Sequence, residues 1–76
     1  MMRRYTVVLE YDSEVALYAA VMPALPGCTS SGVTVEESLA NAREAIQGHI
    51  AVLEEIGLPV PEETEGATVI VATVAA

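Results

Sequence analysis

Three carboxylates that alternate near the N-terminus, Glu10, Asp12 and Glu14, are the first residues of this chain whose spacing could support chemistry. Acids of this kind bind metal ions, but two-metal phosphoryl transfer needs several carboxylates that converge from different elements. The last apolar stretch of the chain, residues 67–74, carries no acid that could join them. We therefore expect Asp12 and Glu14 to be turn residues in water, and we predict no metal site.

Cys28 and His49 are the only cysteine and the only histidine. A cysteine nucleophile needs a positioned base and electropositive surroundings, whereas the chain holds eleven acids against three arginines and no lysine. The acidic composition therefore favours a buried, structural Cys28. His49 is expected to be packed or partly exposed, because no other potential ligand lies at a metal-binding spacing from it. We predict no catalytic residue and no cofactor. A hydrolase that uses Cys28 or the three acids is the least favoured hypothesis.

The 76 residues fit a single domain, residues 1–76, with a small core. Hydrophobic residues are 53% of the chain, but many are Ala or Val and none is Phe or Trp, so surplus apolar surface favours self-association into a homo-oligomer. The net charge of −8 argues against direct nucleic-acid binding, even though Arg3 and Arg4 are adjacent. This charge suits a basic protein partner, and it suits simple solubility equally well.

The cysteine count and the N-terminal pattern bear on where the protein works. A lone cysteine excludes an internal disulfide and is typical of a reducing cytoplasm. The arginine pair is followed by alternating residues rather than a sustained apolar run, so we expect no signal peptide. No stretch approaches the roughly 20 apolar residues of a membrane span. The single Asn and the single Gln indicate a thermophilic source.

Hydrophobic periodicity predicts an α+β two-layer sandwich of order β-β-β-α-β. The expected strands are residues 4–11, 15–21, 27–32 and 67–74, and the expected helix is residues 35–56. Both faces of 67–74 are mostly apolar, which predicts a central strand or one at an oligomer interface. Because the helix is a crossover, we expect this last strand to pair in parallel with an earlier one.

A fixed corner is predicted between the second and third strands. Pro23, Pro26 and Gly27 cannot share a regular helix or a central strand, so the chain must change direction here. Cys28 follows the corner, and Gly32 ends the third strand.

The helix carries start and stop signals. Thr34 and Glu37 fit a capping box, in which the Thr34 hydroxyl accepts the N–H of Glu37 and the Glu37 carboxylate accepts the N–H of Thr34. Gly57, followed by Pro59, closes the helix. Gly48 costs about 1 kcal/mol relative to Ala in the helix interior, and either a close backbone approach or simple tolerance explains it. One apolar stripe recurs with gaps of three and four, at Val35, Leu39, Ala42, Ile46, His49, Leu53 and Ile56.

Taken together, these segments resemble the HicB family of bacterial antitoxins. The residues that carry the resemblance are Pro23-Ala-Leu-Pro-Gly-Cys28, Gly32, Thr34, Glu36-Glu37, Leu39, Asn41-Ala42 and Glu44-Ala45-Ile46. Flanking segments extend the resemblance to about residues 4–61. The family often has Asp at the positions of Ala24 and Val33, so any partner contact that those Asp residues make in relatives is missing here.

The resemblance implies a reduced ribonuclease-H-like fold and an antitoxin without catalysis of its own. Such a domain binds a small basic HicA-type toxin, which cleaves mRNA, and covers its catalytic histidine. Acidic residues along one face would steer a basic partner, and the candidate contacts are Asp12, Glu14, Met22, Pro23 and Leu25. The family commonly carries a C-terminal DNA-binding module, which we do not expect in this chain because one strand alone follows the helix in the sequence. The alternative is an orphan domain that self-assembles as a scaffold or binds a small molecule.

Overall fold

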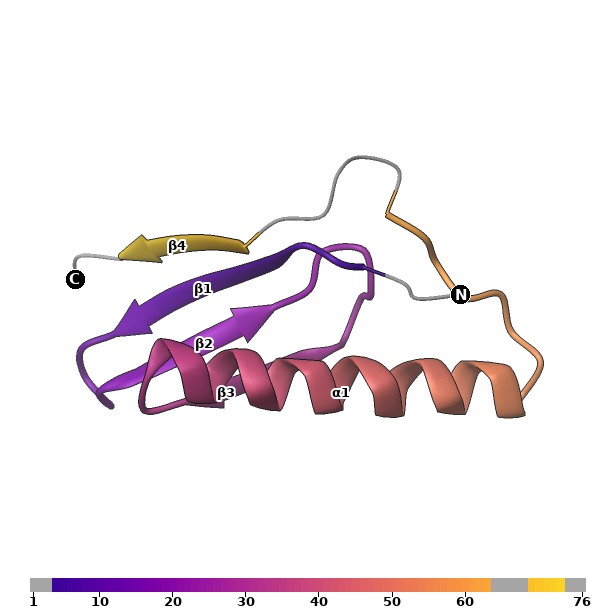
Figure 1. Ribbon diagram of the computed structural model, residues 1–76, viewed down its shortest axis with the longest axis horizontal. Helices are drawn as coiled ribbons and strands as arrows, with labels where there is room; N and C mark the ends of the chain where they lie inside the picture. Colours follow the sequence, from indigo (N-terminus) through magenta and orange to yellow (C-terminus); the bar gives the residue numbers. More distant parts are fainter. Residues whose placement is uncertain (1–3, 64–68, 74–76) are drawn as a thin grey trace.

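A four-stranded sheet with one helix against it makes up the part of the chain that the computed structural model describes, residues 4–63 and 69–73 (Figure 1). The elements follow one another as β1 (Val7–Asp12), β2 (Leu17–Val21), β3 (Thr29–Gly32), α1 (Val35–Glu55) and β4 (Val69–Thr73). This order confirms the predicted α+β fold. Within the described residues, no helix combines the length and the hydropathy that a membrane span requires.

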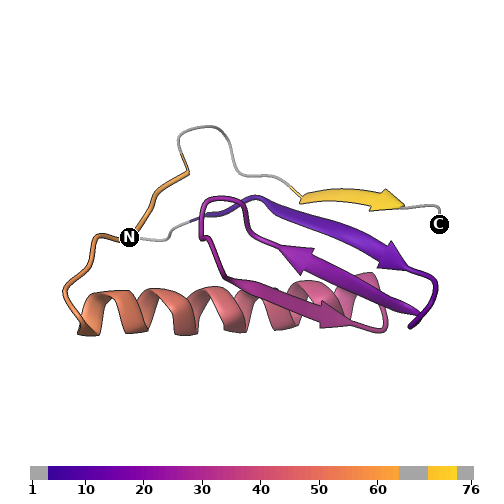
Figure 2. The same cartoon turned by 180° about the vertical axis from the view of Figure 1, so that it is seen from behind.

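The sheet has the strand order β3-β2-β1-β4. The first three strands form an antiparallel meander, and α1 then carries the chain back so that β4 lies beside β1 (Figure 2). β4 runs parallel to β1, with Val7 beside Val69 and Tyr11 beside Thr73. The prediction of a parallel final strand is therefore confirmed, as expected for a strand that follows a helical crossover.

Three strands begin later than the periodicity predicts, at Val7, Leu17 and Thr29 rather than at residues 4, 15 and 27. The first starts at Val7 because the residues before it bond to the segment after the helix: the Tyr5 hydroxyl donates to Pro61 O at 2.6 Å, and Thr6 N–H donates to Glu63 Oε1 at 2.8 Å. The third starts at Thr29 because Gly27 belongs to a turn. The expected strand residues 67, 68 and 74 lie outside the described residues.

Both ends of α1 have the predicted chemistry. Thr34 is the N-cap, with extended backbone angles, and its Oγ1 accepts the N–H of Glu37 at 3.0 Å. Among the hydrogen bonds of the described residues the reciprocal bond, from Thr34 N–H to the Glu37 carboxylate, does not occur, so only half of the predicted capping box forms. At the other end Gly57 has φ of 78°, and the N–H groups of Gly57 and Leu58 donate to the carbonyls of Glu54 and Leu53. This pair of bonds is a Schellman motif, which stops the helix at a left-handed glycine.

The core lies between α1 and the sheet. Its buried apolar residues are Tyr5, Val7, Leu9, Ala20, Met22, Leu25, Cys28 and Ala42. The predicted helical stripe packs here through Val35, Leu39, Ala42 and Ile46, whereas Ile56, at the far end of the stripe, is 61% exposed. The first half of the helix therefore contributes most of its contact with the sheet.

Gly32 lets the start of α1 approach β3 closely. A Cβ added at Gly32 would collide with the backbone nitrogen of Ser38 and lie 2.8 Å from Ser38 Cα. The fully buried Ser38 then donates its hydroxyl to Tyr18 O at 3.1 Å, and Asn41 Nδ2 donates to Ser31 O at 2.8 Å. These contacts fasten the first two turns of α1 to β2 and β3. At Gly48, by contrast, a Cβ would meet nothing within 4 Å, which favours simple tolerance of that glycine.

Candidate partner-binding surface

The turn between β1 and β2 presents two of the predicted contact residues to solvent. Asp12 ends β1, and its Oδ1 accepts the backbone N–H of Glu14 at 3.0 Å. This local bond is an Asx turn, which holds the start of the loop in place. Both acids are exposed, as predicted, and Val15 beside them is 60% exposed.

Ala16, the last residue of this loop, has φ of 54°. Left-handed backbone costs a non-glycine residue about 1–2 kcal/mol. We expect Ala16→Gly to raise the free energy of unfolding by up to about 1 kcal/mol, since glycine removes this strain but adds freedom to the unfolded chain. Urea unfolding would measure the change, and a destabilised variant would show that the Ala16 methyl group makes contacts that outweigh the strain.

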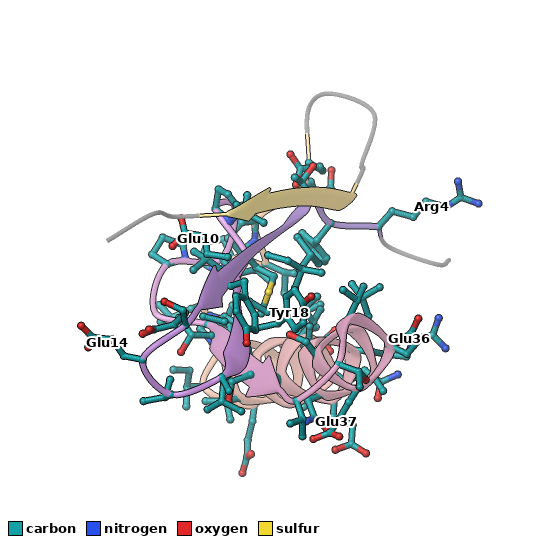
Figure 3. The ribbon with its side chains drawn as sticks, turned by 90° about the vertical axis from the view of Figure 1, so that its left-hand side faces the viewer. Arg4, Glu10, Glu14, Tyr18, Glu36 and Glu37 are labelled. Atoms are coloured by element: carbon teal, nitrogen blue, oxygen red, sulfur yellow. The ribbon has the colours of Figure 1, made fainter. Side chains whose placement is uncertain are left out.

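The topology brings a second pair of acids to the same end of the molecule. β3 runs antiparallel to β2, so it finishes beside the β1–β2 hairpin, and α1 begins there with the exposed Glu36 and Glu37 in its first turn. Figures 1 and 3 agree that the hairpin and the helix start share this end of the fold. We call the surface formed by Asp12, Glu14, Glu36 and Glu37 the acidic end.

Two apolar side chains are exposed in the loops of the acidic end. Val15 lies in the hairpin, and Val33, which is 58% exposed, lies between β3 and α1. Near this end Tyr11 and Tyr18 pair across β1 and β2, with ring centroids 4.9 Å apart and planes tilted by 53°; Figure 3 shows Tyr18. Both tyrosines are half-buried. Half-buried Tyr combines apolar contact area with a polar tip, as interface residues commonly do.

The Pro corner does not belong to this surface. Two consecutive turns build it, with Leu25 N–H donating to Met22 O and Cys28 N–H donating to Leu25 O, both at 3.0 Å. Gly27, with φ of 84°, takes the left-handed position of the second turn, after Pro26. Because β2 runs from the hairpin to this corner, the acids and the corner lie at opposite ends of the strand.

Two of the predicted contact residues are core residues instead. Met22 is 1% exposed and Leu25 is 0% exposed, because the two turns fold both side chains inward over the sheet. Neither offers a side chain to a partner in this structure, so we reassign both from the contact surface to the core. Pro23, between them, is exposed.

Cys28 is a core residue too, and burial raises the pKa of its thiol above the ordinary value of 9.0. The buried thiol is therefore protonated at neutral pH, unlike an activated nucleophile. His49, on α1, is half-buried. In residues 4–63 and 69–73 no three His, Cys, Asp or Glu side chains gather as a metal site would require.

The raised pKa makes the fold sensitive to alkaline pH. Since the folded state holds the Cys28 proton more tightly than the unfolded chain does, the contribution to stability is complete below pH 9.0 and is lost as the pH rises through the folded pKa. We expect the free energy of unfolding to fall above this pH in the wild type and to fall less in Cys28→Ala. Parallel pH profiles of the two proteins would contradict this assignment.

Comparison with known proteins defines the class first. Antitoxin HicB of Burkholderia pseudomallei has an N-terminal domain whose crystal structure superposes with a TM-score of 0.70 and 31% identity, covering 82% of this chain and 72% of that one. The fold is therefore that of an antitoxin domain. Residues 5–73 match the family described as the HicB-like antitoxin of bacterial toxin–antitoxin systems, and this chain belongs to that family.

Three curated relatives, each matched over two thirds or more of its own length, support this membership. A UPF0150 protein of Thermoplasma acidophilum is 37% identical over 60 residues, which are 79% of this chain and 86% of the relative. A UPF0150 protein of Synechocystis is 44% identical over 59 residues, 78% of this chain and 73% of the relative. A third UPF0150 protein, from Thermotoga maritima, is 36% identical over 53 residues, which are 70% of this chain and 67% of the relative.

Proposed function

We propose that this protein is an antitoxin that binds a small basic toxin of the HicA type and blocks its cleavage of mRNA, with no catalysis of its own. One observation carries the proposal beyond family membership: the exposed acids of the β1–β2 hairpin and those of the first turn of α1 lie at the same end of the fold (Figure 3). Because such a toxin acts on mRNA, the complex would form in the cytoplasm.

The acidic end has the properties that recognition of a basic partner requires. Exposed carboxylates around apolar and aromatic side chains steer a cationic protein toward the surface and then offer area to bury. Favourable interaction with the helix dipole accounts for the charges of Glu36 and Glu37 in the first turn of α1, but it explains neither Glu14 nor the exposed Val15 and Val33. The contact we propose therefore centres on the hairpin and the start of α1.

The test is a titration of the purified chain with the HicA-type toxin from the same cell, by calorimetry, with the toxin's RNA cleavage measured alongside. We expect tight, salt-sensitive binding that stops cleavage. A chain that neither binds nor inhibits would refute the proposal, even though its fold would remain that of the family.

An orphan scaffold is the second candidate function. Strand β4 has the sequence Val-Ile-Val-Ala-Thr and lies at an edge of the sheet, which favours self-assembly. A folded protein that assembles but ignores the toxin would support this alternative. A protein that assembles and also inhibits the toxin would keep the antitoxin function and make assembly a second property of it.

A further inference from the structure

The sheet has two edge strands, and only one of them is protected. β3 and β4 lie at opposite edges in the order β3-β2-β1-β4. An edge strand presents backbone N–H and C=O groups that can pair with another chain, and proteins blunt such edges with short strands, charges, proline or a covering element. Neither edge strand contains a charged residue or a proline, so the two edges differ in polarity and in the element that covers them.

β3 is the protected edge. It has four residues, Thr-Ser-Ser-Gly, and α1 packs closely along it. Asn41 Nδ2 donates to Ser31 O at 2.8 Å, so the helix occupies an acceptor on this strand. A short, polar strand whose backbone is already bonded to a helix is a poor template for a further strand.

β4 has none of this cover among the described residues. Its five residues include no charge and no proline, which is the composition of a strand that pairs readily. α1 contacts β1, β2 and β3 but makes no contact with β4. Within the described sheet, β4 has a neighbouring strand on one side alone, which is β1 (Figures 1 and 2). An uncharged edge in a chain of net charge −8 is also where two copies repel each other least.

We propose that β4 pairs antiparallel with β4 of a second copy, about a two-fold axis at Val71, and that the two sheets join into one of eight strands. The pairing is self-complementary, because each Val69 lies opposite the Thr73 of the other copy and the two Val71 residues lie opposite each other. A symmetric dimer needs such an isologous contact.

Charge favours this antiparallel arrangement over a parallel one. β4 runs parallel to β1, so its C-terminal end lies toward the acidic end of its own copy. Antiparallel pairing therefore places the two acidic ends at opposite ends of the joined sheet and brings the exposed Arg4 of each copy toward the acidic end of the other. A parallel pair would set the acidic ends side by side, where like charges repel.

The first test is a cross-link through single cysteines. Directly opposite residues of an antiparallel pair have Cα atoms about 4.5–5.5 Å apart, which lies within the Cα separation that disulfides span. We expect Val71→Cys to form a disulfide-linked dimer under mild oxidation at least about tenfold faster than Ser31→Cys, the matched variant at an exposed residue of the protected β3 edge. The wild type, whose cysteine is buried, serves as the blank. Equal rates at the two edges would overturn the proposal.

The second test is the solution mass by light scattering. We expect the wild type to have about twice the 8.0 kDa mass of the chain, and Val71→Lys and Val71→Glu each to be monomers, because like charges then meet on the axis. Mixing the two variants should restore the dimer through opposite charges. If the lysine variant fails to fold, the cysteine rates decide. A monomeric wild type, or a dimer that ignores both charges, would overturn the proposal.

Discussion

Replacing Gly32 with alanine should lower the free energy of unfolding by about 3 kcal/mol, near the top of the usual range for overpacking a core. The added Cβ would collide with the backbone nitrogen of Ser38 and lie 2.9 Å from the carbonyl carbon of Glu37. These are backbone atoms in a helical turn that is bonded to Thr34 and Tyr18, so no flexible side chain can move aside. Relief requires that α1 shift away from β3.

Gly48→Ala is the matched control, since it makes the same chemical change where a Cβ meets nothing within 4 Å. In the interior of α1 it should raise the free energy of unfolding by about 1 kcal/mol. Urea unfolding of both variants measures the two changes in the free energy of unfolding, provided that its slope against urea concentration is the same in each variant as in the wild type. If Gly32→Ala is as stable as the wild type, then β3 and α1 do not approach as closely as the structure has them.

Local chemistry made much of this fold predictable. Thr34 caps the helix and Gly57 ends it because each signal acts within a few residues, where no distant contact is needed. The strand order β-β-β-α-β follows from period-two and helical patterns, and the parallel pairing of β4 follows from the crossover. Gly32 was identified as the end of a strand, but its close contact with Ser38 depends on tertiary packing that no local pattern encodes.

The candidate surface was harder to predict, because surfaces are assembled by topology. The prolines indicate a corner, but they do not indicate the direction in which Met22 and Leu25 point. Both side chains are buried in the core. In the sequence Glu37 indicates a capping box, although the meander also requires β3, and with it the first turn of α1, to lie beside the hairpin. Applying the antiparallel order to the positions of the acids would have located the acidic end from the sequence.

Replacing the hairpin acids with a neutral and a basic residue should weaken toxin binding more than an equal change of charge elsewhere on the chain. We propose Asp12→Asn with Glu14→Lys, because asparagine keeps the oxygen that accepts the Glu14 N–H and so preserves the turn. If the toxin is steered to the acidic end, its association rate at low salt should fall by about tenfold, and the difference from the wild type should shrink as salt screens the charges. Stopped-flow association at several salt concentrations measures both effects.

The matched control is Glu54→Gln with Glu55→Lys, which changes the net charge by the same amount on two exposed residues at the opposite end of α1. If only net charge matters, the two variants should bind the toxin equally slowly. If the acidic end is the contact, the hairpin variant should be the slower one, and the control should approach the wild type. Equal rates in all three proteins would remove the hairpin from the interface, because electrostatic steering depends on where the charges lie as well as on their sum.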